Sequence, residues 1–196
     1  ITEGTMQVDA IVPFCDISQQ ETEDALAALM TVLHDENPTS DAIRALGHRP
    51  PQWECTDTVP FSSARKWSGA SFRGLGTFVL GAGEFVMKEN FDQIRAQVEK
   101  YSEEGQRVLL LAHCEGSFRN KELPEDVSPL ALILLSDKIR KNAKRTLEYF
   151  ADQGVDIKVI SGDNAITVSN IAKKAGLRSA DNYVDATTLK DYDDIK

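Results

Sequence analysis

The segment from 155 to 176 constrains the fold of this chain more than any other stretch. Residues 155–160 are mainly β-branched and apolar, as is typical of a buried strand. Four small polar residues follow, and 165–175 then carry a helical pattern that Gly176 ends as a C-terminal cap. A strand that stops in such a loop and restarts as a helix presents polar groups at the carboxyl edge of a parallel sheet, where ligands bind. The segment therefore predicts a strand, a loop and a helix at a sheet edge.

The loop Ser161–Asn164 carries groups that suit a phosphoryl ligand. Ser161 offers a hydroxyl and, with Gly162, backbone N–H groups, and the start of the following helix adds partial positive charge. In the alternative interpretation, Ser161 and Asp163 only cap the helix. The residues of the loop leave both interpretations open.

Charge and cysteine content exclude several classes of protein. The formal net charge of −9 argues against a nucleic-acid surface, which needs clustered Lys and Arg, but a single local pocket is enough to bind a nucleotide. Cys15, Cys55 and Cys114 are far apart and form no CxxC motif, so they predict free thiols in a reducing compartment. No apolar run reaches the roughly 18 residues of a membrane span, and no signal peptide or metal-ligand spacing is present.

Hydrophobic periodicity divides the chain into two kinds of structure. The first two-thirds predict an antiparallel α+β domain, with a capping box at Ser18–Glu21 that opens a helix and a hairpin turn at Arg73–Gly76. Thr39 or Ser40 is expected to cap a second, short helix. In residues 130–176 the predicted order of elements is strand, helix, strand, helix, which predicts a parallel sheet with right-handed crossovers. Further elements are expected at 1–8 (strand), 91–104 (helix), 107–112 (strand), 130–135 (strand) and 142–152 (helix).

A second candidate site lies at Phe61–Lys66. An exposed aromatic ring could stack on a base, while Arg65 and Lys66 meet phosphate or ribose. The small residues of Gly81–Gly83 would let backbone approach backbone, or let a flat ligand lie close. The alternative is that Phe61 is a core residue and both cations are solvated ends of strands.

Taken together, these segments resemble the cytoplasmic headpiece of the P-type (E1-E2) cation-transporting ATPases. Six motifs occur in family order and span nearly the whole chain. They are Ile1–Gly4 (after the phosphorylated DKTGT signature), Phe61–Lys66 (F-S-x-x-R-K), Leu80–Glu84 (K-G-A-P-E), Gly105–Leu109 (G-x-R-x-L), Asp137–Arg140 (D-P-P-R) and Ser161–Asn164 (T-G-D).

The resemblance implies a fold of the α+β class with two domains. A hinge strand at 1–8 would lead into a nucleotide-binding domain at 9–135, an antiparallel sheet with flanking helices. Residues 136–196 would form part of a haloacid-dehalogenase-like α/β Rossmann domain, the phosphorylation domain.

The resemblance also implies roles for individual residues. Phe61 would stack on adenine, and the pocket would be lined by Ser63, Lys66, Gly81, Ala82 and Arg107. Asp137 and Arg140 would face ribose and phosphate at the hinge, while Ser161, Gly162 and Asp163 would face the γ-phosphate or a phosphoaspartate. An aspartate attacks the γ-phosphate in this chemistry, and positioned donors neutralise the developing charge.

Several residues depart from the family pattern. Leu80 stands where the family has Lys, so one cation of the adenosine pocket is missing, and Gly83 replaces Pro. Ser63 stands where some relatives carry an Arg that reaches phosphate. Lys138–Ile139 replaces Pro-Pro, so a less stiff hinge is expected.

The resemblance implies a piece of a larger pump that cannot turn over ATP alone. The nucleophilic Asp would precede Ile1, and most Mg²⁺ ligands would follow Lys196. The expected partners are ATP, Mg²⁺ and the transmembrane and actuator domains of the same pump, at the cytoplasmic face of the cell membrane, with Ca²⁺ or Mg²⁺ as cargo. No metal site is expected within this chain itself. Two alternatives are a non-catalytic nucleotide- or protein-binding module and a haloacid-dehalogenase-like phosphatase.

Overall fold

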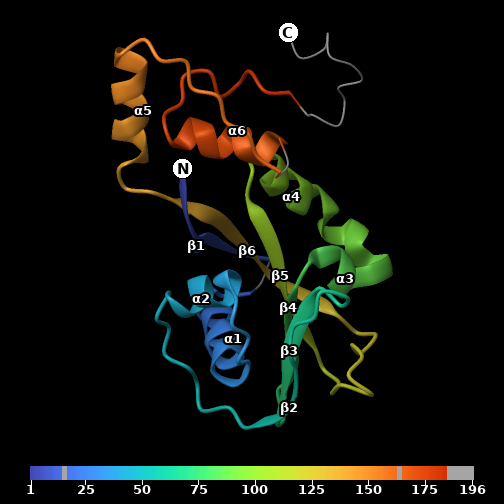
Figure 1. Ribbon diagram of the computed structural model, residues 1–196. Coiled ribbons are helices and arrows are strands. Elements are labelled where there is room, and N and C mark those ends of the chain that lie inside the picture. Colours follow the sequence, from blue (N-terminus) through green and yellow to red (C-terminus); the bar gives the residue numbers. More distant parts are fainter. Residues whose placement is uncertain (15–16, 163–164, 185–196) are drawn as a thin grey trace. The chain divides into compact units, whose positions relative to one another are not determined.

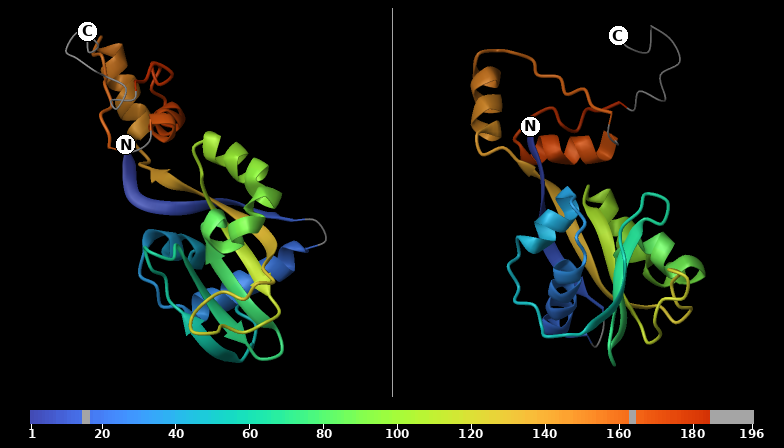
Figure 2. Two further views of the ribbon diagram at one scale, coloured as in Figure 1. Left: turned by 90° about the vertical axis from the view of Figure 1, so that its right-hand side faces the viewer. Right: turned by 60° about the horizontal axis from the view of Figure 1, so that its bottom comes forward.

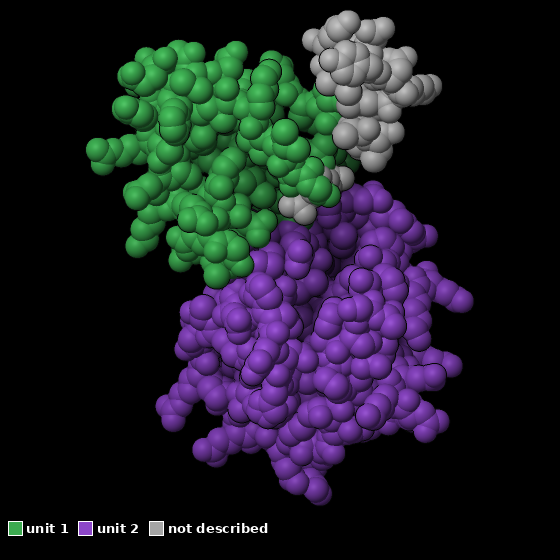
Figure 3. All heavy atoms as spheres, in the orientation of Figure 1, with its two compact units in different colours: residues 1–5, 103–106, 137–196 green, residues 6–102, 107–136 purple. Residues whose placement is uncertain are grey.

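The computed structural model describes residues 1–14, 17–162 and 165–184 (Figure 1). The chain forms two compact units, coloured separately in Figure 3: unit 1 contains 1–5, 103–106 and 137–196, and unit 2 contains 6–102 and 107–136. Within the described part of the chain, every helix is too short or too polar to cross a lipid bilayer. The elements in order are β1 (Thr2–Pro13), α1 (Gln19–Val32), α2 (Pro38–Arg44), β2 (Cys55–Val59), β3 (Trp67–Phe72), β4 (Gly76–Gly81), α3 (Gly83–Met87), the 3-10 helix η1 (Lys88–Phe91), α4 (Asp92–Glu103), β5 (Arg107–Cys114), β6 (Ser128–Ile139), α5 (Ala143–Asp152) and α6 (Ala165–Lys174).

One six-stranded sheet, in the order β1-β6-β5-β4-β3-β2, organises unit 2. The pairs β2–β3, β3–β4, β4–β5 and β5–β6 are all antiparallel. The predicted turn at Arg73–Gly76 closes the β3–β4 hairpin, in which Phe72 pairs with Gly76. The predicted antiparallel sheet with flanking helices is therefore confirmed.

Helices cover both faces of this sheet (Figures 1 and 2). Alternation along β4 sends Phe78 and Leu80 to the face covered by α1 and α2, where Leu26 and Leu29 are buried. Val79 points to the opposite face and packs in the cluster of Ile94 from α4. The sheet thus has two apolar cores, and the first of them forms the floor of the cavity described below.

Local sequence signals set the starts of the first two helices. The predicted capping box is present, because the Ser18 hydroxyl accepts from the Glu21 amide and the Glu21 carboxylate accepts from the Ser18 amide. The expected cap of α2 at Thr39 or Ser40 is wrong. Asn37 is the N-cap and accepts from the Ser40 amide at 2.9 Å, with Pro38 at the first helical position. Proline suits that position because it has no N–H to leave unsatisfied.

Unit 1 contains α5 and α6, but the predicted strand at 155–160 is wrong. This segment has no regular structure, and the side chain of Ile160 is 96% exposed. A strand forms only beside a partner with free hydrogen-bonding groups. The expected parallel partner was the strand at 130–135, which is part of β6 and lies between β1 and β5. Both of its edges are occupied, so no parallel sheet forms among the described residues of 130–176.

The helix predicted after the loop is present as α6. Gly176 follows it with a φ of +92°, as expected for a C-terminal cap. Of the polar loop before α6, Asp163 and Asn164 lie outside the described residues.

Candidate functional site

A cavity of about 390 Å³ lies in unit 2, on the face of the sheet that α1 and α2 cover. Five of the six residues predicted to bind a nucleotide line it, although they come from three separate motifs. The full lining is Asp35, Asn37, Pro38, Thr39, Ser40, Phe61, Lys66, Ser68, Leu80, Gly81, Ala82, Arg107 and Leu109.

Phe61 provides an aromatic ring on this cavity. Its side chain is 46% exposed, so the alternative that Phe61 is a core residue is wrong. The chain leaves β2 at Val59, which is fully buried, and Pro60 and Phe61 carry it out to the surface. The amide of Phe61 donates to the Asp35 carboxylate, with the nitrogen 3.1 Å from Oδ1. A ring in this position has a free face for a flat ligand.

Lys66 reaches the cavity through an unusual backbone conformation. Its φ is +61°, in the left-handed region that side-chain-bearing residues rarely adopt. Its amide donates to the Ser62 carbonyl at 2.8 Å, and its carbonyl accepts from the Ala82 amide at 3.0 Å. Non-glycine residues in this region cluster at ligand sites, where the surrounding structure holds them.

The same turn keeps Ser63 and Arg65 out of the cavity lining, although Ser63 is predicted to line the pocket and Arg65 is one candidate for contact with phosphate or ribose. The Arg65 amide donates to the Ser62 hydroxyl at 3.1 Å, which closes the turn. The Arg65 guanidinium donates to the Pro60 carbonyl at 2.8 Å and lies over the Trp67 ring, 5.6 Å from its centroid. Arg65 therefore supports the loop, and Lys66 is the cation that this motif supplies to the cavity.

Gly81 lies where two backbone segments meet. A Cβ at this position would collide with the Cβ of Trp67 and would lie 2.6 Å from the Lys66 carbonyl oxygen. The expectation that small residues let backbone approach backbone here is confirmed. The close approach brings Ala82 and Lys66 to one wall of the cavity.

Sequence reasoning missed the residues that the α1–α2 connection and the sheet contribute. Ser68 is the most informative of them, because it is only 5% exposed and still lines the cavity. A hydroxyl group that lines a cavity can hydrogen-bond to a ligand there. The available signal was strand alternation, since Ser68 shares the inward positions of β3 with Ala70 and Phe72.

The chemistry of the lining divides into apolar and charged parts. Leu80 and Leu109 form an apolar floor near the Phe61 ring. Lys66 and Arg107 supply two positive charges, against the single carboxylate of Asp35. An aromatic ring, an apolar floor and two cations fit a ligand with a flat ring and an anionic tail.

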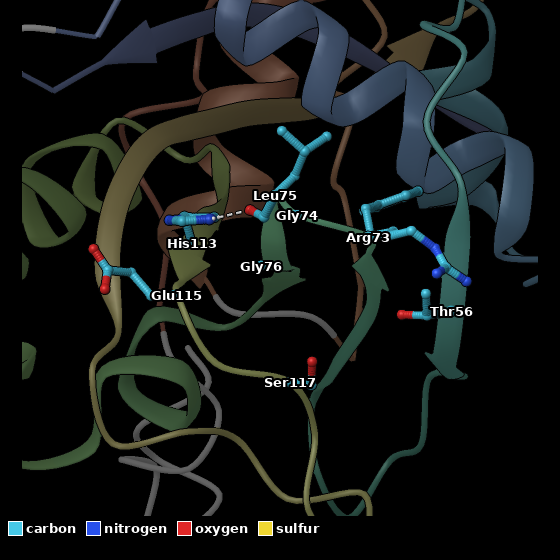
Figure 4. A pocket seen from close by; sticks show the side chains of 9 residues that line it. Thr56, Arg73, Gly74, Leu75, Gly76, His113, Glu115 and Ser117 are labelled. Atoms are coloured by element: carbon cyan, nitrogen blue, oxygen red, sulfur yellow. Dashed lines mark hydrogen bonds between the residues drawn. The ribbon is translucent and has the colours of Figure 1, made fainter.

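A second cavity, of about 840 Å³, lies beside the β3–β4 turn (Figure 4). Most of its lining residues are exposed, so it is a shallow depression of the surface. Figure 4 shows the His113 ring turned toward Leu75, whose carbonyl oxygen lies 2.7 Å from Nε2. Its lining is Thr56, Phe72, Arg73, Gly74, Leu75, Gly76, His113, Glu115 and Ser117, and sequence reasoning placed no ligand there.

The predicted catalytic residues that the structure describes belong to unit 1. Asp137 is half-buried in β6. Arg140 follows β6, and its amide and Nε donate to the carbonyls of Ile1 and Thr2 at 3.0 and 2.8 Å. Ser161 and Gly162 are exposed before α6, and Asp163 lies outside the described residues. Their action on a phosphoryl group stays a prediction. Among the described residues, no three His, Cys, Asp or Glu side chains gather as a metal site.

Comparison with solved structures defines the class of fold. No protein-family model matches the chain. The fold is similar to that of a zinc-transporting PIB-type ATPase, with a TM-score of 0.69 and 21% identity over 90% of this chain and 26% of that chain. A second crystal structure of a zinc-transporting PIB-type ATPase, in another state, gives a TM-score of 0.69 and 22% identity over the same shares of the two chains. The architecture is thus that of a P-type ATPase domain.

Sequence relatives carry the assignment from fold to family. The "Probable cation-transporting ATPase exp7" of Streptococcus pneumoniae is 38% identical over 197 residues, which cover 97% of this chain and 24% of that protein. The "Calcium-transporting ATPase CtpE" of Mycobacterium bovis is 40% identical over 178 residues, 90% of this chain and 22% of that protein. The chain belongs to the P-type cation-transporting ATPase family, and it spans about a quarter of the length of these relatives.

Proposed function

We propose that this chain is the ATP-binding portion of an ATP-driven cation pump that works through an aspartyl-phosphate intermediate. One observation carries the proposal: a single cavity gathers Phe61, Lys66, Gly81, Ala82 and Arg107 from three motifs that are far apart in the sequence. Family membership supports the same function. We assign nucleotide binding to residues 9–135 and phosphoryl transfer to 136–196, with 1–8 as a hinge strand.

The lining of the cavity supports a specific division of labour. Adenine stacks on the ring of Phe61, and Leu80 and Leu109 exclude water from its edge. The Ser68 hydroxyl bonds to a polar atom of the nucleoside. Lys66 and Arg107 neutralise the phosphates. The ammonium of Lys66 acts as a compact charge, and the planar guanidinium of Arg107 can donate two parallel hydrogen bonds. Mg²⁺ accompanies the phosphates, and most of its ligands belong to the rest of the pump.

In this proposal, residues of unit 1 take part in the phosphoryl-transfer step. Ser161, Gly162 and Asp163 donate to or orient the γ-phosphate, and Asp137 and Arg140 act at the ribose and phosphate. The nucleophilic aspartate belongs to the remainder of the pump, together with the transmembrane and actuator domains. The chain then works at the cytoplasmic face of the cell membrane, and the name of the Mycobacterium bovis relative makes Ca²⁺ the first cargo to test.

Titration of the ¹⁵N-labelled chain with ATP and ADP tests the proposal. We expect amide shifts at Phe61, Gly81 and Arg107, and no acid-stable phosphoprotein when labelled ATP and Mg²⁺ are added. A haloacid-dehalogenase-like phosphatase would instead hydrolyse small phosphomonoesters without these shifts, and a protein-binding module would show neither. Absence of the shifts at millimolar ATP would contradict the proposal.

A further inference from the structure

We infer that Asp35 is a positioning residue for the nucleotide site: its carboxylate fixes the backbone of Phe61 and so sets where the aromatic ring lies. This inference rests on the proposed function. It concerns a residue outside all six motifs of the resemblance, contributed by the connection between α1 and α2.

The hydrogen bond between these residues joins two distant parts of the chain. The Phe61 amide nitrogen lies 3.1 Å from Oδ1 and 3.4 Å from Oδ2 of Asp35. Phe61 follows a proline that has no N–H, and its ring is about half exposed, so packing covers only part of it. The carboxylate holds the N–H side of the Pro60–Phe61 peptide beside the cavity, while Arg65 holds the carbonyl side of the same peptide.

Asp35 is itself held in place by Arg44, near the end of α2. The guanidinium of Arg44 donates to the carbonyl oxygens of Asp35 and Leu33, at 3.1 and 2.8 Å. Asp41 orients the same guanidinium through an ion pair of 3.2 Å. The connection after α1 is thus tied to α2, so the carboxylate has a fixed support, as ligand-orienting groups require.

The charge of Asp35 gives the site a direction. A carboxylate beside Phe61 repels phosphates, whereas Lys66 and Arg107 attract them. The base end of the nucleotide therefore lies at Phe61 and Asp35, and the phosphate end lies at the two cations. Asp35 both positions the ring and disfavours the reversed orientation.

Calorimetric titration of the 196-residue chain with ATP tests this inference, with the variants Asp35→Ala, Asp35→Asn, Phe61→Ala and the double variant D35A/F61A. We expect D35A to weaken ATP binding about three- to tenfold, because it loses the hydrogen bond to the Phe61 amide. D35N keeps an oxygen acceptor and is expected to bind within about twofold of the unmodified chain. D35A should cause no further loss when Phe61 is already alanine, since its effect passes through the ring.

Controls separate positioning from a general loss of structure or charge. Glu36→Ala removes the neighbouring carboxylate, which does not line the cavity, and should leave ATP affinity unchanged. The Phe61 amide resonance should move in D35A even without ATP, a change that a global loss of stability does not produce. If D35A does not fold, Asp35→Glu displaces the carboxylate by one methylene and should weaken binding while D35N does not.

Several outcomes would overturn the inference. The inference fails if D35A binds ATP as tightly as the unmodified chain does. It also fails if D35A lowers ATP affinity equally with and without the Phe61 ring, or if D35N lowers ATP affinity tenfold. In all of these the unmodified chain still binds ATP, so the proposed function survives. A chain that binds no ATP at all contradicts the proposed function instead.

Discussion

The carbonyl oxygen of Lys66 accepts a hydrogen bond from the amide of Ala82 at 3.0 Å. This bond joins the loop that carries the aromatic ring to the bend that follows β4. The same carbonyl lies where a side chain on Gly81 would have to go. The position of the Lys66 cation therefore depends on a glycine from a different motif.

Gly81→Ala should destabilise the chain and weaken ATP binding at least about tenfold. Its methyl group overlaps Trp67 and the Lys66 carbonyl, and such overpacking typically costs about 1–3 kcal/mol. Chemical denaturation and ATP titration measure the two effects. Gly116→Ala is the matched control, because a Cβ there would lie 3.5 Å from Pro124, an ordinary contact. Equal behaviour of the two variants would contradict the close approach at Gly81.

Phe61→Ala should weaken ATP binding by about 1–3 kcal/mol, the usual loss when a base loses an aromatic stacking partner. This corresponds to a dissociation constant about 5- to 150-fold higher. Folding stability should change little, because the ring is about half exposed. Phe85→Ala, which removes an exposed ring that does not line the cavity, serves as the control and should leave affinity intact. A similar loss in both variants would mean that the effect is not stacking.

Ser18→Ala should lower the free energy of unfolding by about 1 kcal/mol, as loss of a helix N-cap does. Hydrogen bonds from the Ser18 hydroxyl and amide hold the pKa of the Glu21 carboxyl below its ordinary value of 4.5. A carboxyl whose pKa is lower in the folded state stabilises the fold at pH values above its unfolded-state pKa. This stabilisation is lost as the pH falls through the folded-state pKa. Denaturation of both proteins between pH 7 and pH 3 should show the difference shrinking with acid. A constant difference would show that Glu21 takes no part.

The Cys114 thiol should be unreactive toward alkylating reagents at pH 8 in the folded chain. Burial, and then the negative charge of Asp126, raise its pKa to about 12 from an ordinary 9.0, so almost no thiolate forms. The experiment uses Cys15→Ser, because Cys15 lies outside the described residues, and Cys55 serves as the more exposed comparison. Alkylation of Cys114 without denaturant would contradict its burial.

The raised pKa of Cys114 also predicts a pH dependence of stability. Between about pH 9 and 12 the unfolded thiol loses its proton while the folded thiol keeps it, so stability falls as pH rises. Replacing Cys114 with alanine removes this contribution. The unfolding free energy of the Cys114→Ala variant should therefore decline less steeply above pH 9 than that of the unmodified chain.

Local signals in the sequence predicted the helices and hairpins well. The capping box at Ser18 and the turn at Arg73–Gly76 each depend on a few neighbouring residues, so the sequence contains all the information needed. Prediction of the strand at 155–160 depended on a distant partner and was wrong, because β6 pairs with β5 and lies beside β1. An apolar run forms a strand only where the rest of the fold leaves it a free edge.

For the candidate site, the sequence by itself determined which motifs supply an aromatic ring, cations and small residues, and these motifs carry the resemblance to the family. Only the tertiary structure decided that Lys66 enters the cavity while Ser63 and Arg65 do not, and that Asp35 and Ser68 join it. The reason is physical: residue types follow from local chemistry, but the walls of a cavity are set by long-range pairing of strands and by hydrogen bonds between distant loops.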